Sequence, residues 1–91
     1  MTVKLEKEFV IQNKLGLHAR PAAQFVQLTS KFMSDIVIRR EGEEVNGKSI
    51  MGVLMLAAPQ GTRIKVIAEG EDAESALREI EKLITSGFGE E

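Results

Sequence analysis

Two stretches of the chain carry apolar residues at helical spacing, and this pattern limits the possible folds most. The first predicts a helix from about Pro21 to about Phe32, and Pro21 suits its first turn because the missing N–H costs no hydrogen bond there. The second begins after Asp72, a suitable N-cap, and ends at Gly87. Its stripe comprises Ala73, Ala76, Leu77, Ile80, Leu83 and Ile84. Both stripes need an apolar surface to pack against.

Alternating apolar and polar residues predict the sheet that supplies this surface. A first strand carries apolar residues on alternate positions, interrupted only by Lys7: Val3, Leu5, Phe9 and Ile11. The segments Ile36–Arg40 and Glu43–Val45 are predicted as strands joined by a tight turn at residues 41–42. A fourth strand is predicted at Ile64–Ala68.

A short helix completes the predicted order. Ser49 can cap a helix over Ile50–Leu56, which Pro59 and Gly61 then end. The elements therefore follow the order β-α-β-β-α-β-α. One antiparallel or mixed sheet with helices on one face would bury both stripes, so we predict an α+β two-layer fold.

Size and composition exclude several classes of protein. The 91 residues suffice for one domain, residues 1–91, without a repeat or a linker. Cysteine is absent, and together with the polar start Met1–Glu8 this favours the reducing cytoplasm. No apolar run reaches the roughly 20 residues that span a bilayer, so we expect no membrane association. The net charge is −2 and no Tyr or Trp is present to stack on bases, so we expect no nucleic-acid partner.

The stretch GLHARPAA, Gly16 to Ala23, contains the only histidine of the chain. His18 lies just before the first predicted helix, where free N–H groups and the positive end of the dipole favour an anion over an imidazolium. Arg20 adds a guanidinium. A neutral imidazole is a nucleophile, and a phosphoryl group on it would meet these same positive groups. The residues suit a histidine that accepts and then gives up a phosphoryl group.

Ordinary interpretations stay open at this point. A single histidine at a helix start is more often a surface or capping residue, and an arginine such as Arg20 is more often a solvated charge. A metal site lacks support, because the chain has no second histidine and no cysteine to share the ion with His18. We expect neither a metal nor a cofactor.

The stretch GEEVNGKS, residues 42–49, matches the nucleotide-binding pattern G-x-x-x-x-G-K-S letter for letter. A phosphate-binding loop needs small residues whose N–H groups converge on the anion, whereas Glu43 and Glu44 would repel it. The helix after Ser49 is also short. We therefore reject nucleotide binding and expect Gly47 and Ser49 to form a turn and an N-cap.

The short predicted helix is apolar at every position from Ile50 to Leu56 except Gly52. A domain this small cannot bury all its sides, so part of it should face solvent or a partner. The exposed set is predicted to be Ile50, Met51 and Leu54. Ser49 serves at least as a cap, worth roughly 1 kcal/mol. A phosphate on Ser49 would place about two negative charges beside the apolar patch, so phosphorylation there would regulate docking.

GLHARPA and, some thirty residues later, NGKSIMGVLML together resemble the HPr family, the histidine phosphocarriers of the bacterial phosphoenolpyruvate-dependent phosphotransferase system. The likeness extends over essentially the whole chain. It implies an open-faced β-sandwich, in which a four-stranded antiparallel sheet is covered on one face by three helices. It also implies a stoichiometric phosphoryl carrier in the cytoplasm that works without a cofactor and is not itself an enzyme.

The resemblance also implies roles for individual residues. His18 would receive a phosphoryl group on Nδ1 from phospho-enzyme I and pass it to an enzyme IIA for sugar transport, with Arg20 beside it. Ser49 matches the serine modified by HPr kinase/phosphorylase. Partner proteins are expected to dock on a chain that is itself a monomer, over Ala19, Ala23, Gln24, Gln27, Ile50, Met51 and Leu54.

Alternatives remain within and outside this family. The stretches NKLGLHARPA and SGFGEE look similar to the nitrogen-related branch of the system, whereas GKSIMGV looks more like its serine-regulated, sugar-type branch. The alternative function is therefore an NPr-like carrier that acts in regulation rather than in sugar transport. Outside the family, the rivals are a nucleotide-binding protein that uses GEEVNGKS and an adaptor domain without phosphate chemistry.

Overall fold

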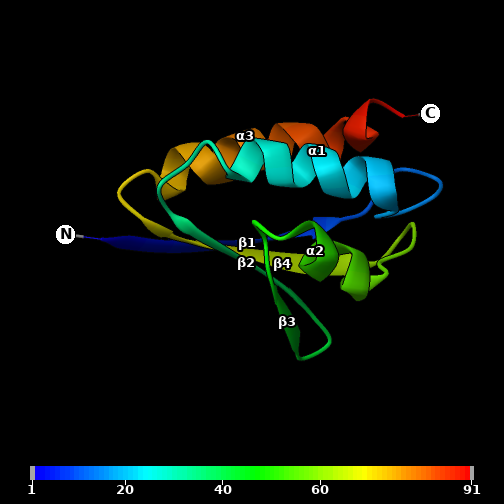
Figure 1. The fold of residues 1–91 in the computed structure, drawn as a ribbon, viewed down its shortest axis with the longest axis horizontal. Coiled ribbons are helices and arrows are strands. Elements are labelled where there is room, and N and C mark those ends of the chain that lie inside the picture. Colours follow the sequence, from blue (N-terminus) through cyan, green and yellow to red (C-terminus); the bar gives the residue numbers. More distant parts are fainter. Residues whose placement is uncertain (1, 91) are drawn as a thin grey trace.

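The order of helices and strands follows the prediction. The structure is a computed structural model that describes residues 2–90. Its elements are β1 (Val3–Val10), α1 (Ala19–Thr29), β2 (Asp35–Arg40), β3 (Glu43–Asn46), α2 (Ile50–Leu56), β4 (Arg63–Gly70), α3 (Ala73–Thr85) and the single 3₁₀ turn η1 (Gly87–Gly89) (Figure 1). None of the helices in the described residues is long and apolar enough to cross a lipid bilayer.

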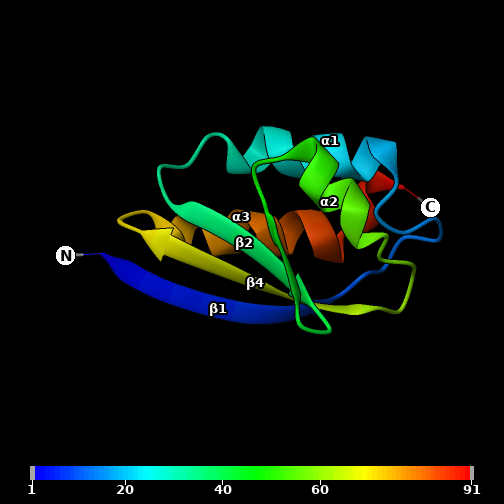
Figure 2. The same cartoon turned by 60° about the horizontal axis from the view of Figure 1, so that its bottom comes forward.

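The four strands form one antiparallel sheet in the order β1-β4-β2-β3. The helices α1 and α3 lie side by side on one face of this sheet, and α2 lies between α1 and the β3 edge (Figures 1 and 2). The opposite face carries no helix of residues 2–90 (Figure 1). The predicted open-faced α+β sandwich is therefore confirmed.

The core lies between the sheet and the two long helices. Phe25 of α1 and Ile80 of α3 belong to one buried cluster with the sheet residues Ile38 and Val66, and all four side chains are fully buried. Burying one such side chain stabilises a fold by about 1.5–3 kcal/mol relative to leaving it exposed. The apolar stripes of the two helices thus pack against the apolar side of the sheet, as the spacing predicted.

Lys7 interrupts the alternation of β1 without disturbing the strand. It occupies a position whose side chain points to the helix side, where its Nζ lies 2.8 Å from Glu81 Oε1 on α3. Both side chains are about half exposed at the margin of the core, at 49% and 42%. The lysine therefore extends past the edge of the apolar layer to an ion pair, and its charge stays solvated.

The limits of α1 differ from the predicted Pro21–Phe32. The helix begins at Ala19 and ends at Thr29. Pro21 is still tolerated, because the N–H groups of the first turn have no helical acceptor. After Thr29, the amides of Lys31 and Phe32 bond to carbonyls three residues earlier, which tightens the last turn. Phe32 packs against the core from this tightened turn, which explains why the apolar spacing extended beyond the helix.

Asp72 is the N-cap residue of α3, as predicted, but its side chain makes no capping hydrogen bond to the helix. Its carboxylate instead accepts hydrogen bonds from the amides of Met33, at 2.8 Å, and Ser34, at 2.9 Å, and from the Ser34 hydroxyl. These bonds tie the loop between α1 and β2 to the loop between β4 and α3. Gly70 allows the approach, because a Cβ at this position would clash with Ser34. The hydrogen bonds from the Ser34 hydroxyl and the Met33 amide lower the pKa of Asp72.

We predict that this clamp makes the stability of the protein sensitive to acid. Since the pKa of Asp72 is lower in the folded than in the unfolded chain, its contribution is present above the unfolded value of about 3.9 and is lost as the pH falls through the folded value. The midpoint of urea unfolding should fall between pH 6 and pH 3 by less in Asp72→Asn than in the parent. The exposed control Glu71→Gln should behave as the parent. Equal pH dependence of Asp72→Asn and the parent would contradict the assignment.

Candidate functional site

His18 is the N-cap residue of α1. Its backbone is extended, with φ −83° and ψ −168°, and its carbonyl accepts the first helical hydrogen bond, from the Ala22 amide at 3.0 Å. The side chain makes no capping bond to the helix. The predicted position at the helix start is confirmed, and because the helix begins at Ala19 rather than at Pro21, His18 directly precedes it. The amides of Ala19 and Arg20 open the helix beside the ring, where free N–H groups favour an anion.

The loop before His18 is fixed to the segment that follows α2. The Leu17 amide donates to the Ala58 carbonyl at 2.9 Å, and Leu17 itself is buried. Gly16 has a φ of +70°, and a Cβ there would clash with the Ala58 carbonyl oxygen and the Pro59 backbone. Only glycine fits this approach. The position of His18 therefore depends on the packing of Gly16 against the end of α2.

A carboxylate from the far end of the chain contacts the His18 ring. The Nε2 atom lies 3.0 Å from Glu90 Oε2 and 3.2 Å from Glu90 Oε1. The Nδ2 amide group of Asn13 donates to Glu90 Oε1 at 3.0 Å and to the Gly16 carbonyl at 2.7 Å. The His18 side chain is 35% exposed and that of Glu90 only 15%. The site thus contains an acid that the sequence analysis did not include.

The C-terminal turn η1 brings Glu90 to this position. Gly87, Phe88 and Gly89 all have positive φ, at 66°, 58° and 72°, so the chain winds in the left-handed sense after α3. Phe88 is 2% exposed and anchors the turn in the core. Residues 87–90 therefore lie beside the start of α1 (Figures 1 and 2). The sequence does contain a signal for an anchored tail: Phe88 is a bulky apolar residue between two glycines and lies outside the helical stripe.

Glu90 is ionised at neutral pH. Burial of the carboxyl group by itself raises the pKa of Glu90, but the hydrogen bonds from His18 and Asn13 lower it, and the electrostatic attraction of His18 and Arg20 acts in the same direction. The balance leaves the pKa of Glu90 below its ordinary value. The Arg20 guanidinium itself is exposed and has no hydrogen bond or ion pair within residues 2–90. It is available to an incoming anion.

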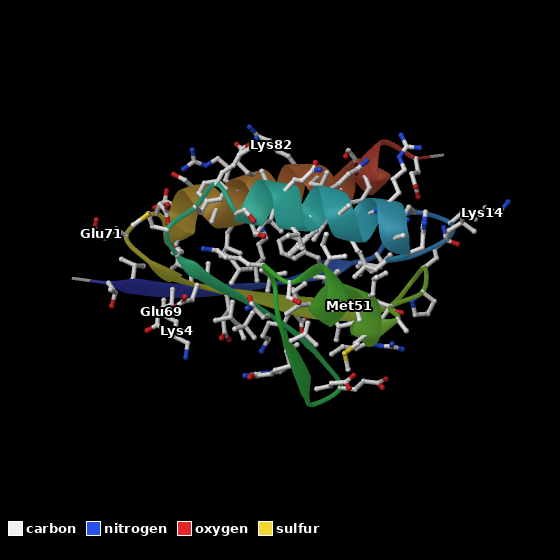
Figure 3. All side chains as sticks on the ribbon, viewed as in Figure 1. Lys4, Lys14, Met51, Glu69, Glu71 and Lys82 are labelled. Atoms are coloured by element: carbon white, nitrogen blue, oxygen red, sulfur yellow. The ribbon has the colours of Figure 1, made fainter. Side chains whose placement is uncertain are left out.

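The residues predicted to contact partners lie on two adjacent helices. On α1, Ala19 and Gln27 are exposed and Ala23 and Gln24 are half-buried. On α2, the exposed fractions are 44% for Ile50 and 69% for Met51, Leu54 is half-buried, and Figure 3 marks Met51 at the surface of this helix. Two further exposed residues were missed by the sequence analysis: Leu15, at 72%, and Met55, at 67%.

A hollow of about 320 Å³ lies between His18 and α2. Leu15, Leu17 and Leu54 line it, together with the segment from Ala57 to Pro59. The hollow joins the reactive ring to the exposed apolar side chains of α2. A partner that reaches His18 would therefore also cover apolar surface.

The two chain segments that supply α1 and α2 contain no acidic residue. No Asp or Glu occurs from Phe9 to Ser34 or from Val45 to Ala68. The helices α1 and α2 lie within these two segments and contact each other. Lys14, Arg20 and Lys31 give the first segment a positive charge, and Glu90 reaches it from outside. We call the surface formed by α1 and α2 the acid-free face.

Ser49 caps α2, as predicted. Its Oγ accepts from the Gly52 amide at 3.1 Å. The rejection of a phosphate loop at residues 42–49 agrees with the structure, because Gly42 lies in a hairpin turn and residues 43–46 form β3. Lys48 Nζ donates to the Phe32 carbonyl at 2.7 Å and is thus engaged in the fold. Gly47 is required by its contact with Ile36, where a Cβ would clash.

Comparison with known proteins gives consistent results. A family profile described as the PTS HPr component phosphorylation site matches residues 5–86. The phosphocarrier protein HPr of Xylella fastidiosa is 49% identical over 87 residues, which cover 96% of this chain and 98% of the relative. A crystal structure of HPr from Thermoanaerobacter tengcongensis matches with a TM-score of 0.92 at 50% identity, covering 96% of this chain and 98% of the other. The HPr-like protein Crh of Bacillus subtilis is 43% identical over 76 residues, or 84% of this chain and 89% of the relative.

We predict that the Phe88 side chain anchors residues 87–90 and that its removal destabilises the protein measurably. Phe88→Ala should lower the free energy of unfolding by roughly 3 kcal/mol, as large-to-small changes in a core do. Denaturant unfolding measures this loss. Met33→Ala, at a side chain that is 88% exposed, is the control and should leave the stability unchanged. A loss below about 1 kcal/mol for Phe88→Ala would show that the tail is not anchored by this ring.

Proposed function

The chain belongs to the HPr family of the phosphotransferase system, and from this membership we propose that it is a cytoplasmic phosphoryl carrier. In this proposal His18 accepts a phosphoryl group from phospho-enzyme I and passes it to an enzyme IIA in the uptake of a sugar. The chain is consumed and regenerated and does not turn over a small substrate by itself. The observation that carries the proposal is the half-exposed His18 ring at the open N-terminus of α1, with Arg20 unengaged beside it.

The proposed transfer is an in-line displacement at phosphorus. The Nδ1 lone pair of His18 forms the new N–P bond while the bond between phosphorus and the donor atom breaks, and its electron pair stays with the donor. The first amides of α1 and the Arg20 guanidinium stabilise the negative oxygens in this step. Transfer onward reverses these roles, so His18 becomes the leaving group. Stabilising the transition state more than the phosphorylated protein keeps the group mobile.

The acid-free face supports docking by partners with acidic surfaces. The charged residues of its two segments are all Lys or Arg, and exposed Met51 and Met55 give it adaptable apolar contacts. Such a surface suits both a donor and an acceptor, because flexible methionines can adjust to different shapes. Relay contacts of this kind are expected to be small and short-lived. A monomer meets this requirement.

We also propose that Ser49 is a regulatory site for an HPr kinase/phosphorylase. A phosphate on Oγ would remain at the N-terminus of α2, where it can still accept from the Gly52 amide. It would add about two negative charges to the acid-free face. An acidic partner would then be repelled by the same surface that otherwise attracts it.

A second candidate is an NPr-like carrier that acts in regulation rather than in sugar uptake. The stretch SGFGEE looks similar to that branch, and its residue Glu90 contacts His18. The identity of the enzyme IIA that accepts the phosphoryl group from the purified protein distinguishes the two candidates.

We predict that labelled phosphoenolpyruvate and enzyme I transfer one phosphate to this chain. The label should be stable to base and labile to acid, as expected for phosphorus on nitrogen. It should be lost in His18→Ala and retained in Ser49→Ala, the matched control. Label that persists in His18→Ala, or no label on the parent protein, would contradict the proposal.

We predict that Ser49→Asp weakens binding to enzyme I. The added charge lies on the acid-free face, so titration calorimetry should show a Kd raised by about tenfold, or 1.4 kcal/mol. Ser75→Asp places the same charge at an exposed position of α3 and serves as the control, with a Kd equal to that of the parent. An unchanged Kd for Ser49→Asp would remove the electrostatic basis of the regulation.

A further inference from the structure

We propose that Glu90 is a positioning residue for phosphoryl transfer, whose carboxylate holds the ring proton of His18 on Nε2 and thereby keeps the Nδ1 lone pair free to attack. This inference rests on the proposed function of His18. It assigns a role to a residue that lies 72 positions from the histidine in the chain.

The contact itself determines which ring nitrogen carries the proton. An ionised carboxylate only accepts hydrogen bonds. Both oxygens of Glu90 lie at hydrogen-bonding distance from Nε2, at 3.0 and 3.2 Å. A lone pair on Nε2 would face two negative oxygens, whereas an N–H there donates to them. A neutral imidazole carries one proton, so placing it on Nε2 leaves the lone pair on Nδ1.

Asn13 keeps the carboxylate in place. It is 2% exposed, and its Nδ2 donates to both Glu90 Oε1 and the Gly16 carbonyl. The carboxylate is thus held by a buried amide on one side and faces the ring on the other. Phe88 fixes the backbone two residues earlier. A merely solvated C-terminal acid would have none of these restraints.

The arrangement lets the proton stay in one place throughout the transfer. When the Nδ1 lone pair forms the N–P bond and the donor bond breaks, the ring becomes positive, and its Nε2–H then makes a charge-assisted bond to Glu90. When the group moves on, the N–P electron pair returns to Nδ1 and the ring is again neutral with the same Nε2–H. No proton has to be moved in either direction. The two ring nitrogens point apart, so Glu90 lies away from the phosphoryl side.

Nitrogen-detected NMR of the ring in the unphosphorylated, full-length protein tests this inference. At a pH where the ring is neutral, the parent should show the Nε2–H tautomer. In Glu90→Gln the amide can rotate and donate to Nε2, so the Nδ1–H tautomer should increase severalfold. Glu90→Ala, which removes the acceptor without adding a donor, should lie between the two. The control Glu71→Gln, on a remote exposed loop, should match the parent.

Transfer kinetics complete the test. With enzyme I and phosphoenolpyruvate, Glu90→Gln should lower the maximal rate of phosphorylation by about tenfold or more, as loss of the correct histidine tautomer does elsewhere, at an unchanged KM for the carrier. An unchanged tautomer ratio, or a shifted ratio with an unchanged rate, would overturn the role of Glu90. Failure of the parent to accept label would instead overturn the proposed function of His18. The tautomer measurement is independent of that result, because it uses the unphosphorylated protein.

Discussion

The hydrogen bond from the Leu17 amide to the Ala58 carbonyl determines where α1 begins, and the candidate site depends on it. With Gly16 packed against the same segment, the chain has to turn into the helix at His18. The ring therefore stands at the helix end where free amides favour an anion. The same contact links the site to α2, whose other end is capped by Ser49. One short helix thus connects the proposed site of transfer with the proposed site of regulation.

Charge is distributed so that this face can serve more than one partner. The two segments without Asp or Glu supply α1 and α2, while the acidic residues that make the net charge −2 lie on other parts of the chain. Glu90 is the exception that reaches His18, and it contacts the ring nitrogen that the proposed chemistry leaves protonated. Lysine and arginine side chains of the face therefore serve to attract an acidic partner, whereas the single carboxylate of Glu90 serves to hold the ring proton on Nε2.

Local sequence patterns predicted the elements, the Ser49 cap and the exposure of Ile50 and Met51, because periodicity and capping are determined by near neighbours. Leu54, predicted to be exposed, is half-buried, and the exposed Met55 was missed. Contacts between distant residues escaped them. Asp72 occupies the N-cap position of α3, yet its carboxylate accepts hydrogen bonds from Met33 and Ser34 in another loop. Glu90 depends on three consecutive residues with positive φ, which bring the tail back to the histidine. The end of α1 was placed too late, since Phe32 keeps its apolar spacing in a tightened turn.

The central claim is that phosphorus becomes bonded to the Nδ1 atom of His18. Phosphorus–nitrogen coupling in the NMR spectrum of the nitrogen-labelled protein, phosphorylated through enzyme I, measures this bond directly. We expect one phosphorus per chain, coupled to Nδ1, with a hydrogen on Nε2. Phosphorus on Nε2, or on any residue other than His18, would contradict it.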